Sequence, residues 1–117
     1  MNRYLFIFGY ETPEQFKYNS ECGTDDEDSI AFFLDAPDES AALNRGREIA
    51  AEFAQRLFAA SGMESPWSSD NYANWIEHRP LDRFSGLALE TLDVVQPNET
   101  PNYDDWIGGG FGGSIKP

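Results

Sequence analysis

The chain has 117 residues, of which 40% are hydrophobic and 15% aromatic, enough to bury a core in one domain over residues 1–117. Its 21 acidic and eight basic residues give a formal net charge of −13. This charge disfavours direct binding to nucleic acid or to anionic membranes and favours a basic protein partner. No stretch approaches the roughly 20 apolar residues of a membrane-spanning helix, and the one cysteine, Cys22, fits a reducing compartment. We therefore expect a cytoplasmic protein.

The first expected element is a strand at residues 4–10, with the sequence YLFIFGY. Successive side chains of a strand point to opposite faces, and here both faces are apolar, which predicts a central strand covered on both sides. The helix described below supplies one cover. The second cover is either the C-terminal segment or another chain, and the sequence leaves both open.

Residues 11–28 are predicted to form a long, polar connecting loop, which we call the acidic loop. Acidic residues are concentrated in this part of the chain, since residues 11–39 hold ten of the 21 acids and a single base, Lys17. Long connections inside compact domains are usually functional or mobile. The segment is therefore the first place to look for a binding site.

Four consecutive acidic residues end this connection: Asp25, Asp26, Glu27 and Asp28. They form a calcium-like cluster, a contact surface for a partner, or a solvated loop kept open by repulsion between like charges. A calcium loop of the EF-hand type is excluded. Counted from Asp25, its sixth and twelfth positions are Ile30 and Ala36, where glycine and glutamate are needed.

A second strand is expected at residues 29–34, paired antiparallel with the first, and a long amphipathic helix at about residues 36–61. Apolar or small residues recur in the helix at spacings of three and four, which places them on one stripe: Ala42, Gly46, Ile49, Ala50, Phe53, Leu57 and Ala60. Asp35 is the expected N-cap and Gly62 the expected left-handed stop. Gly46 on the buried stripe indicates close packing of the helix on the sheet.

Aromatic residues gather after the helix, where residues 69–78 are predicted to form a short second helix. Tyr72, Trp75 and Ile76 share one side of that helix, with Trp67 just upstream. The group has two interpretations. It is either a satellite core at the end of the domain or an exposed patch for a partner, because Trp and Tyr often carry interface energy.

The last expected strand is residues 87–95, although their leucine, alanine and glutamate content would also suit a helix. Residues 97–117 form a turn-rich tail that docks through Trp106 or Phe111. Together the elements predict an α+β fold. It has a small, mostly antiparallel sheet of three to four strands, one long amphipathic helix packed on a face, a short second helix and an irregular glycine-rich tail.

The sequence supports neither a catalytic residue, nor a metal site, nor a cofactor. The glycines of residues 108–113 match a dinucleotide-binding pattern in letters only, because too few residues follow for the helix that holds the phosphates. His78 is the sole histidine, Cys22 has no clear basic partner, and adjacent carboxylates such as Asp104 and Asp105 do not by themselves make an acid and base pair.

Three functional hypotheses follow. The favoured one is a non-enzymatic acidic protein that covers a basic surface of a protein partner, as small acidic inhibitors, immunity proteins against basic toxins and protein mimics of nucleic acid do. This is an analogy of size and charge without a diagnostic motif. The predicted partner-binding residues are Glu21, Asp25, Asp26, Glu27, Asp28, Trp67, Tyr72 and Trp75. The alternatives are a structural or assembly subunit, either a homodimer or a docking module, and a small enzyme that brings Asp104, Asp105 and the acidic loop together in a cleft.

Overall fold

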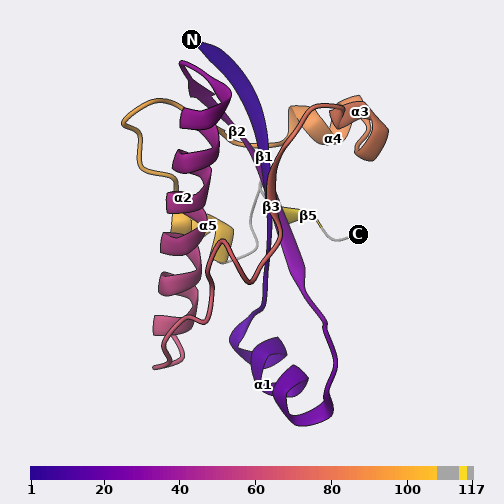
Figure 1. Ribbon diagram of the computed structural model, residues 1–117, viewed down its shortest axis with the longest axis vertical. Helices are drawn as coiled ribbons and strands as arrows, with labels where there is room; N and C mark the ends of the chain where they lie inside the picture. The colour runs from indigo at the N-terminus through magenta and orange to yellow at the C-terminus, as the bar shows by residue number, and fades with distance from the viewer. Residues whose placement is uncertain (108–113, 116–117) are drawn as a thin grey trace.

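The computed structural model describes residues 1–107 and 114–115 and has an α+β fold, with one long helix packed on a mostly antiparallel sheet (Figure 1). This is the predicted fold class. The elements in chain order are β1 (Asn2–Tyr10), α1 (Pro13–Cys22), β2 (Asp28–Ala36), α2 (Glu39–Ala59), β3 (Asn74–Glu77), α3 (Pro80–Arg83), α4 (Gly86–Glu90), β4 (Val94–Val95), α5 (Tyr103–Ile107) and β5 (Ser114–Ile115).

The sheet has the order β3-β1-β2-β4, and β5 also pairs with β2. β1 and β2 form a long antiparallel pair that runs from Asn2 opposite Ala36 to Tyr10 opposite Asp28. β3 is antiparallel on the other edge of β1, and β4 is parallel to β2. The predicted antiparallel pairing of the first two strands and the central position of the first are therefore confirmed.

The main core lies between α2 and one face of the sheet. Phe6, Phe8 and Phe32 have no exposed surface there, and they pack against the stripe of α2 that the sequence indicated. Phe8 and Phe53 meet edge to face with ring centroids 5.8 Å apart. Burial of these large side chains contributes most of the free energy that holds the helix on the sheet.

The ends of α2 confirm one expectation and correct another. Gly62 has φ of 70°, and the N–H groups of Gly62 and Met63 donate to the carbonyls of Ala59 (2.9 Å) and Phe58 (3.0 Å), as in a Schellman stop. The predicted cap Asp35 is wrong. Asp38 caps the helix, with its side chain accepting from the N–H of Ala41 at 2.8 Å.

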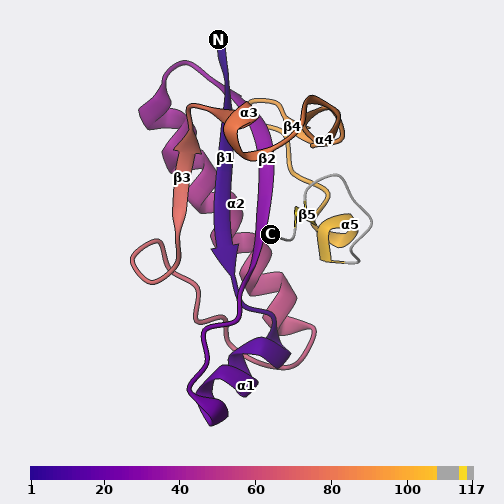
Figure 2. The same ribbon diagram turned by 90° about the vertical axis from the view of Figure 1, so that its right-hand side faces the viewer.

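The far face of the sheet is covered by the same chain. Leu5, Ile7 and Ala31 are at most 3% exposed. They pack in one cluster with Leu92, Phe33, Trp75, Phe84 and Leu89. Most of the last group belongs to the α3–α4 segment and its flanks, which Figure 2 shows across the upper part of the sheet. Part of the open question about the second cover is thus answered by the segment between β3 and β4.

Residues 69–78 do not form the predicted helix, because residues 74–77 are the edge strand β3. In a strand the side chains of Trp75 and Ile76 point to opposite faces. Ile76 joins the core under α2, while Trp75 joins the far-face cluster. Asn74 fixes the strand to its surroundings, accepting from Nε of Arg47 at 2.8 Å. The prediction interpreted the spacing of the aromatic residues as the 3.6-residue period of a helix, whereas residues 74–77 follow the two-residue period of a strand.

The prediction for residues 87–95 is half right, since only Val94–Val95 forms a strand, β4. The residues before it form α4, whose N-cap Ser85 accepts from the N–H of Ala88 at 3.1 Å. The leucine, alanine and glutamate residues of this stretch have high intrinsic helix propensities, which agree with the helix found there.

The predicted loop over residues 11–28 is also wrong in part, because it contains the ten-residue helix α1. Thr12 and Gln15 form a capping box, in which the N–H of Gln15 donates to Oγ1 of Thr12 (3.1 Å) and the N–H of Thr12 donates to Oε1 of Gln15 (2.8 Å). Pro13 occupies the first turn and Gly23 ends the helix with φ of 69°. All four signals are present in the sequence.

The tail docks through Trp106, as predicted. Its ring centroid lies 5.1 Å from that of Phe32, and its Nε1 donates to Oδ2 of Asp93 at 2.6 Å. Phe111 and the glycines of residues 108–113 lie outside the described residues.

Among the helices that the structure describes, none combines the length and the apolar character needed to cross a membrane.

Candidate functional site

The candidate site is the acidic end of the molecule, which we define as α1 and the loop of residues 23–28 that follows it. Both views place this end opposite the N-terminus (Figures 1 and 2). Residues 11–28 carry seven acidic side chains and one basic side chain. The carboxylates of Glu21, Asp25 and Asp26 are exposed there. Among the ion pairs of the described residues, none involves an acid of residues 11–28.

Asn19 of α1 holds the loop in place. Its Oδ1 accepts from Oγ1 of Thr24 (2.6 Å) and from the N–H of Asp26 (3.1 Å). Its Nδ2 donates to the carbonyl of Asp26 (2.8 Å) and to Oε2 of Glu11 (2.6 Å). One side chain thus satisfies both backbone groups of Asp26, so the loop is shaped by hydrogen bonds even though its carboxylates repel one another.

Glu11 connects the acidic end to two of the predicted aromatic residues. The hydroxyl of Tyr72 donates a short hydrogen bond to Oε1 of Glu11. The ring of Tyr72 lies parallel to that of Trp67, at an interplanar angle of 8° and a centroid distance of 6.3 Å. Trp67 is anchored in turn, since its Nε1 donates to the carbonyl of Gly9 at 2.9 Å. Burial and the hydrogen bond to Glu11 raise the pKa of Tyr72, so its hydroxyl stays a donor.

Trp75 does not belong to this group, although the sequence placed it there. It faces the other side of the sheet, where the guanidinium of Arg83 lies 5.1 Å from the ring centroid. Arg83 also forms an ion pair of 2.9 Å with Glu77. Trp75 is therefore a packing residue of the far face.

The carboxyl group of Glu27 lies near the negative charges of Glu11 and Asp25. Its carboxyl group lies so close to Gly9 that a β-carbon there would stand 2.8 Å from Oε1 of Glu27. Partial burial against this backbone, together with the negative charges of Glu11 and Asp25, raises the pKa of Glu27. This end of the molecule therefore holds more negative charge than its own side chains neutralise.

The structure adds residues that the sequence did not single out as site residues. Tyr18 lies on α1 with 52% of its surface exposed, so the acidic end presents an aromatic side chain to solvent. Glu11, Asn19 and Gly9 organise the site through tertiary contacts. Glu11 and Gly9 have partners distant in sequence, Tyr72 and Trp67, which no local pattern reveals. The partners of Asn19 are five to eight residues away, but no motif of the sequence marks these contacts.

The other residues considered from the sequence lie elsewhere. Asp104 and Asp105 belong to α5, which packs beside α2 away from α1 in both views (Figures 1 and 2), so they do not meet the acidic loop. His78 follows β3, and its Nε2 lies 3.0 Å from Oε1 of Glu39. Cys22 is exposed at the end of α1. Within the described part of the chain, no three acidic, histidine or cysteine side chains are arranged to hold a metal ion.

Comparison of the chain with protein-family models, with curated proteins and with solved structures gave no match.

Proposed function

We propose that this chain is a non-enzymatic binding protein whose acidic end covers a basic surface of a protein partner. The observation that carries the proposal is the exposure of Glu21, Asp25 and Asp26 on a loop that Asn19 holds in shape, with no ion pair to neutralise them in the described structure. Such a surface attracts a basic partner over a long range. A cytoplasmic location is part of the proposal and is supported by the single cysteine.

Two features of the acidic end favour binding over mere solvation. A loop already fixed by hydrogen bonds loses little conformational entropy when a partner docks. Tyr18 supplies exposed aromatic surface beside the carboxylates, and buried aromatic contacts are the usual source of slow dissociation. Inhibition of a basic enzyme or toxin is the form of this function that charge and size suit best.

The test is affinity capture from a lysate of the source cell with the tagged chain, at about 0.05 M and about 0.5 M salt. The binding variant combines Glu21→Gln, Asp25→Asn and Asp26→Asn. The matched control combines Asp82→Asn, Glu90→Gln and Asp104→Asn, which removes the same charge from exposed positions outside the acidic end.

A basic protein that is recovered by the unmodified chain and by the control, but lost with the binding variant and at high salt, would support the proposal. Equal recovery with the binding variant would assign the interaction to another surface. Recovery of no basic protein by the unmodified chain would count against the function itself.

A second candidate, an assembly subunit or docking module, is favoured by two leucines on the segment that covers the far face. Leu81 of α3 and Leu87 of α4 are 72% and 78% exposed. Contiguous apolar surface marks contact sites in soluble proteins, and this candidate requires that the two leucines belong to one such surface. A solution mass above that of the monomer, reduced by Leu81→Gln together with Leu87→Gln, would favour the homodimer form of this candidate, and a monomeric mass at micromolar concentration would argue against it.

A further inference from the structure

A pocket of about 440 Å³ lies at the end of the molecule opposite the acidic end, between the first half of α2, the end of β2 and the turn after β4. Its accessible apolar lining consists of Pro37, Ala41 and Pro97, and the buried side chains of Leu34, Ala36 and Val95 lie at its base. A concave apolar wall with a few polar groups on its rim is the usual form of a small-molecule site.

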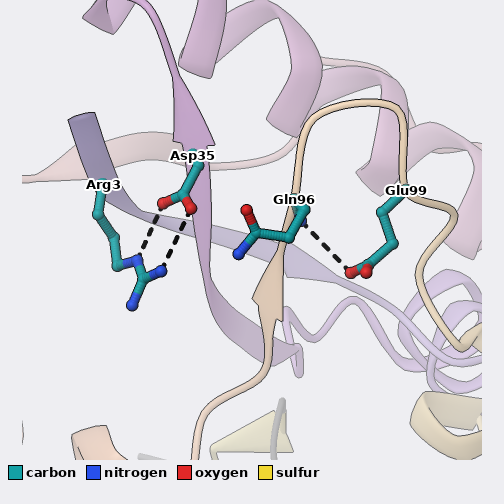
Figure 3. Close-up of polar contacts among 4 residues, drawn as sticks. All are labelled: Arg3, Asp35, Gln96 and Glu99. Atoms are coloured by element: carbon teal, nitrogen blue, oxygen red, sulfur yellow. Dashed lines mark hydrogen bonds and ion pairs between the residues drawn. The ribbon is translucent and has the colours of Figure 1, made fainter. Parts of the chain in front are cut away.

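The turn of residues 96–99 forms one side of the pocket and is well defined (Figure 3). The N–H of Glu99 donates to the carbonyl of Gln96 at 3.0 Å, and the N–H of Gln96 donates to Oε1 of Glu99 at 3.3 Å. Pro97 at the second position and Asn98 at the third, with φ of 65°, are the residues that a type II turn prefers. This wall therefore exists before any ligand arrives.

Arg45 is the one basic residue among the described residues that line the pocket. One N–H of its Nη2 donates to the carbonyl of Glu99 at 3.0 Å, which holds the guanidinium on the rim and leaves its other donors available. In a chain with 21 acidic residues, Arg45 takes part in none of the ion pairs found among the described residues.

The two carboxylates of the pocket differ in their availability. Asp35 already accepts from Nε (2.9 Å) and Nη2 (3.2 Å) of Arg3, as Figure 3 shows, so its charge is matched. Glu48 lies one turn after Arg45 on α2 and faces the pocket without an ion pair among the described residues. The rim therefore offers one cation for a carboxylate and, next to it, one carboxylate that would suit an ammonium group.

We infer that this pocket binds a small organic carboxylate with an apolar body. The body would lie on the apolar surface that Pro37, Ala41 and Pro97 expose, and the carboxylate would accept hydrogen bonds from the guanidinium of Arg45. A ligand that also carries an ammonium group beside its carboxylate, as an apolar amino acid does, would use Glu48 as well. This site is separate from the acidic end and does not depend on the function proposed for it.

The test is a titration of the ¹⁵N-labelled chain followed by two-dimensional NMR, with 4-methylpentanoate, its neutral amide and free leucine as probes. We expect the carboxylate to shift backbone amides of residues 34–48 and 95–99 selectively, with a dissociation constant on the order of 1 mM, usual for so small a ligand. The neutral amide should bind about tenfold more weakly, because it offers no charge to Arg45.

Two variants and a control make the assignment specific. Arg45→Gln should weaken binding of the carboxylate about tenfold. Ala41→Leu should weaken it by filling the pocket while leaving Arg45 in place. Arg79→Gln, which removes the same charge from an exposed position outside the pocket, should leave binding unchanged.

Leucine binding more tightly than 4-methylpentanoate, with the advantage lost in Glu48→Gln, would support the inference and extend it to amino acids. The opposite order would support a simple carboxylate. Equal affinity for the carboxylate and its amide, binding insensitive to Arg45→Gln and Ala41→Leu, or no localised shifts with any probe would overturn the inference.

Discussion

Gly46 of α2 lies directly against the ring of Phe6 in β1, so that a β-carbon at Gly46 would stand 2.4 Å from Cδ1 of Phe6. Phe6 has no exposed surface and is held between Phe8 and Phe32, at ring centroid distances of 6.0 Å and 5.6 Å. The ring has no free space to enter. The missing side chain of Gly46 is therefore what allows α2 to approach the sheet this closely.

This contact sets the expected effect of Gly46→Ala. Alanine would gain about 1 kcal/mol in helix propensity, but a methyl group forced into a packed core costs about 1–3 kcal/mol and the clash here is severe. We expect a net loss of about 1–2 kcal/mol in the free energy of unfolding, measured by urea denaturation. Gly86→Ala, where nothing lies within 4 Å, should be neutral or stabilising. A Gly46→Ala variant as stable as the unmodified chain would contradict the packing described.

The loop of the acidic end depends on Asn19. Asn19→Ala removes all four hydrogen bonds of this side chain and leaves the backbone groups of Asp26 without these partners. We expect a loss of about 1–2 kcal/mol in stability and faster amide hydrogen exchange at Asp26. Ser20→Ala, the next position on α1 and exposed, is the control and should change neither quantity. Unaltered exchange at Asp26 in Asn19→Ala would mean that another contact orders the loop.

Glu27 makes the stability of the fold depend on pH. Its raised pKa means that the folded state binds more protons than the unfolded state between the ordinary pKa of glutamate, about 4.3, and the raised value. The free energy of unfolding therefore falls as the pH rises through this window.

Glu27→Gln removes this penalty. We expect the variant to have a higher thermal midpoint than the unmodified chain at pH 7 and the same midpoint near or below about pH 4. Glu90→Gln, which removes an equal charge from an exposed position on α4, controls for the general effect of net charge. If Glu27→Gln and Glu90→Gln gave the same midpoint at pH 7, the crowding of carboxylates around Glu27 would play no part in stability.

The sequence was informative where local patterns reflect packing directly. The two apolar faces of β1 and the glycine at position 62 follow from a period or a backbone requirement, and both are found in the structure. The predicted stripe of α2 is found from Ala42 to Phe53, but near the end of the helix Phe58 is buried, Leu57 is only half-buried and Ala60 is exposed. Helix α1 is predictable from Thr12, Pro13, Gln15 and Gly23, but its polar composition favours a loop when these capping signals are not weighed.

Other features depend on contacts between distant parts of the chain. β3 is a strand because Trp75 and Ile76 pair with Ile7 and Phe6, and nothing within residues 69–78 specifies that pairing. The separation of Trp75 from Trp67 and Tyr72 follows from it. The pocket beside Arg45 is likewise built by three segments that only the tertiary fold brings together.

The most direct test of the proposed function is the rate of association with the basic partner, measured by stopped flow over a range of salt concentrations. For the variant with Glu21→Gln, Asp25→Asn and Asp26→Asn, we predict an association rate about tenfold lower at low salt and a shallower dependence on salt. The variant with Asp82→Asn, Glu90→Gln and Asp104→Asn should keep both properties of the unmodified chain. Equal association rates and equal salt dependence for the two variants would contradict the assignment of the acidic end as the binding surface.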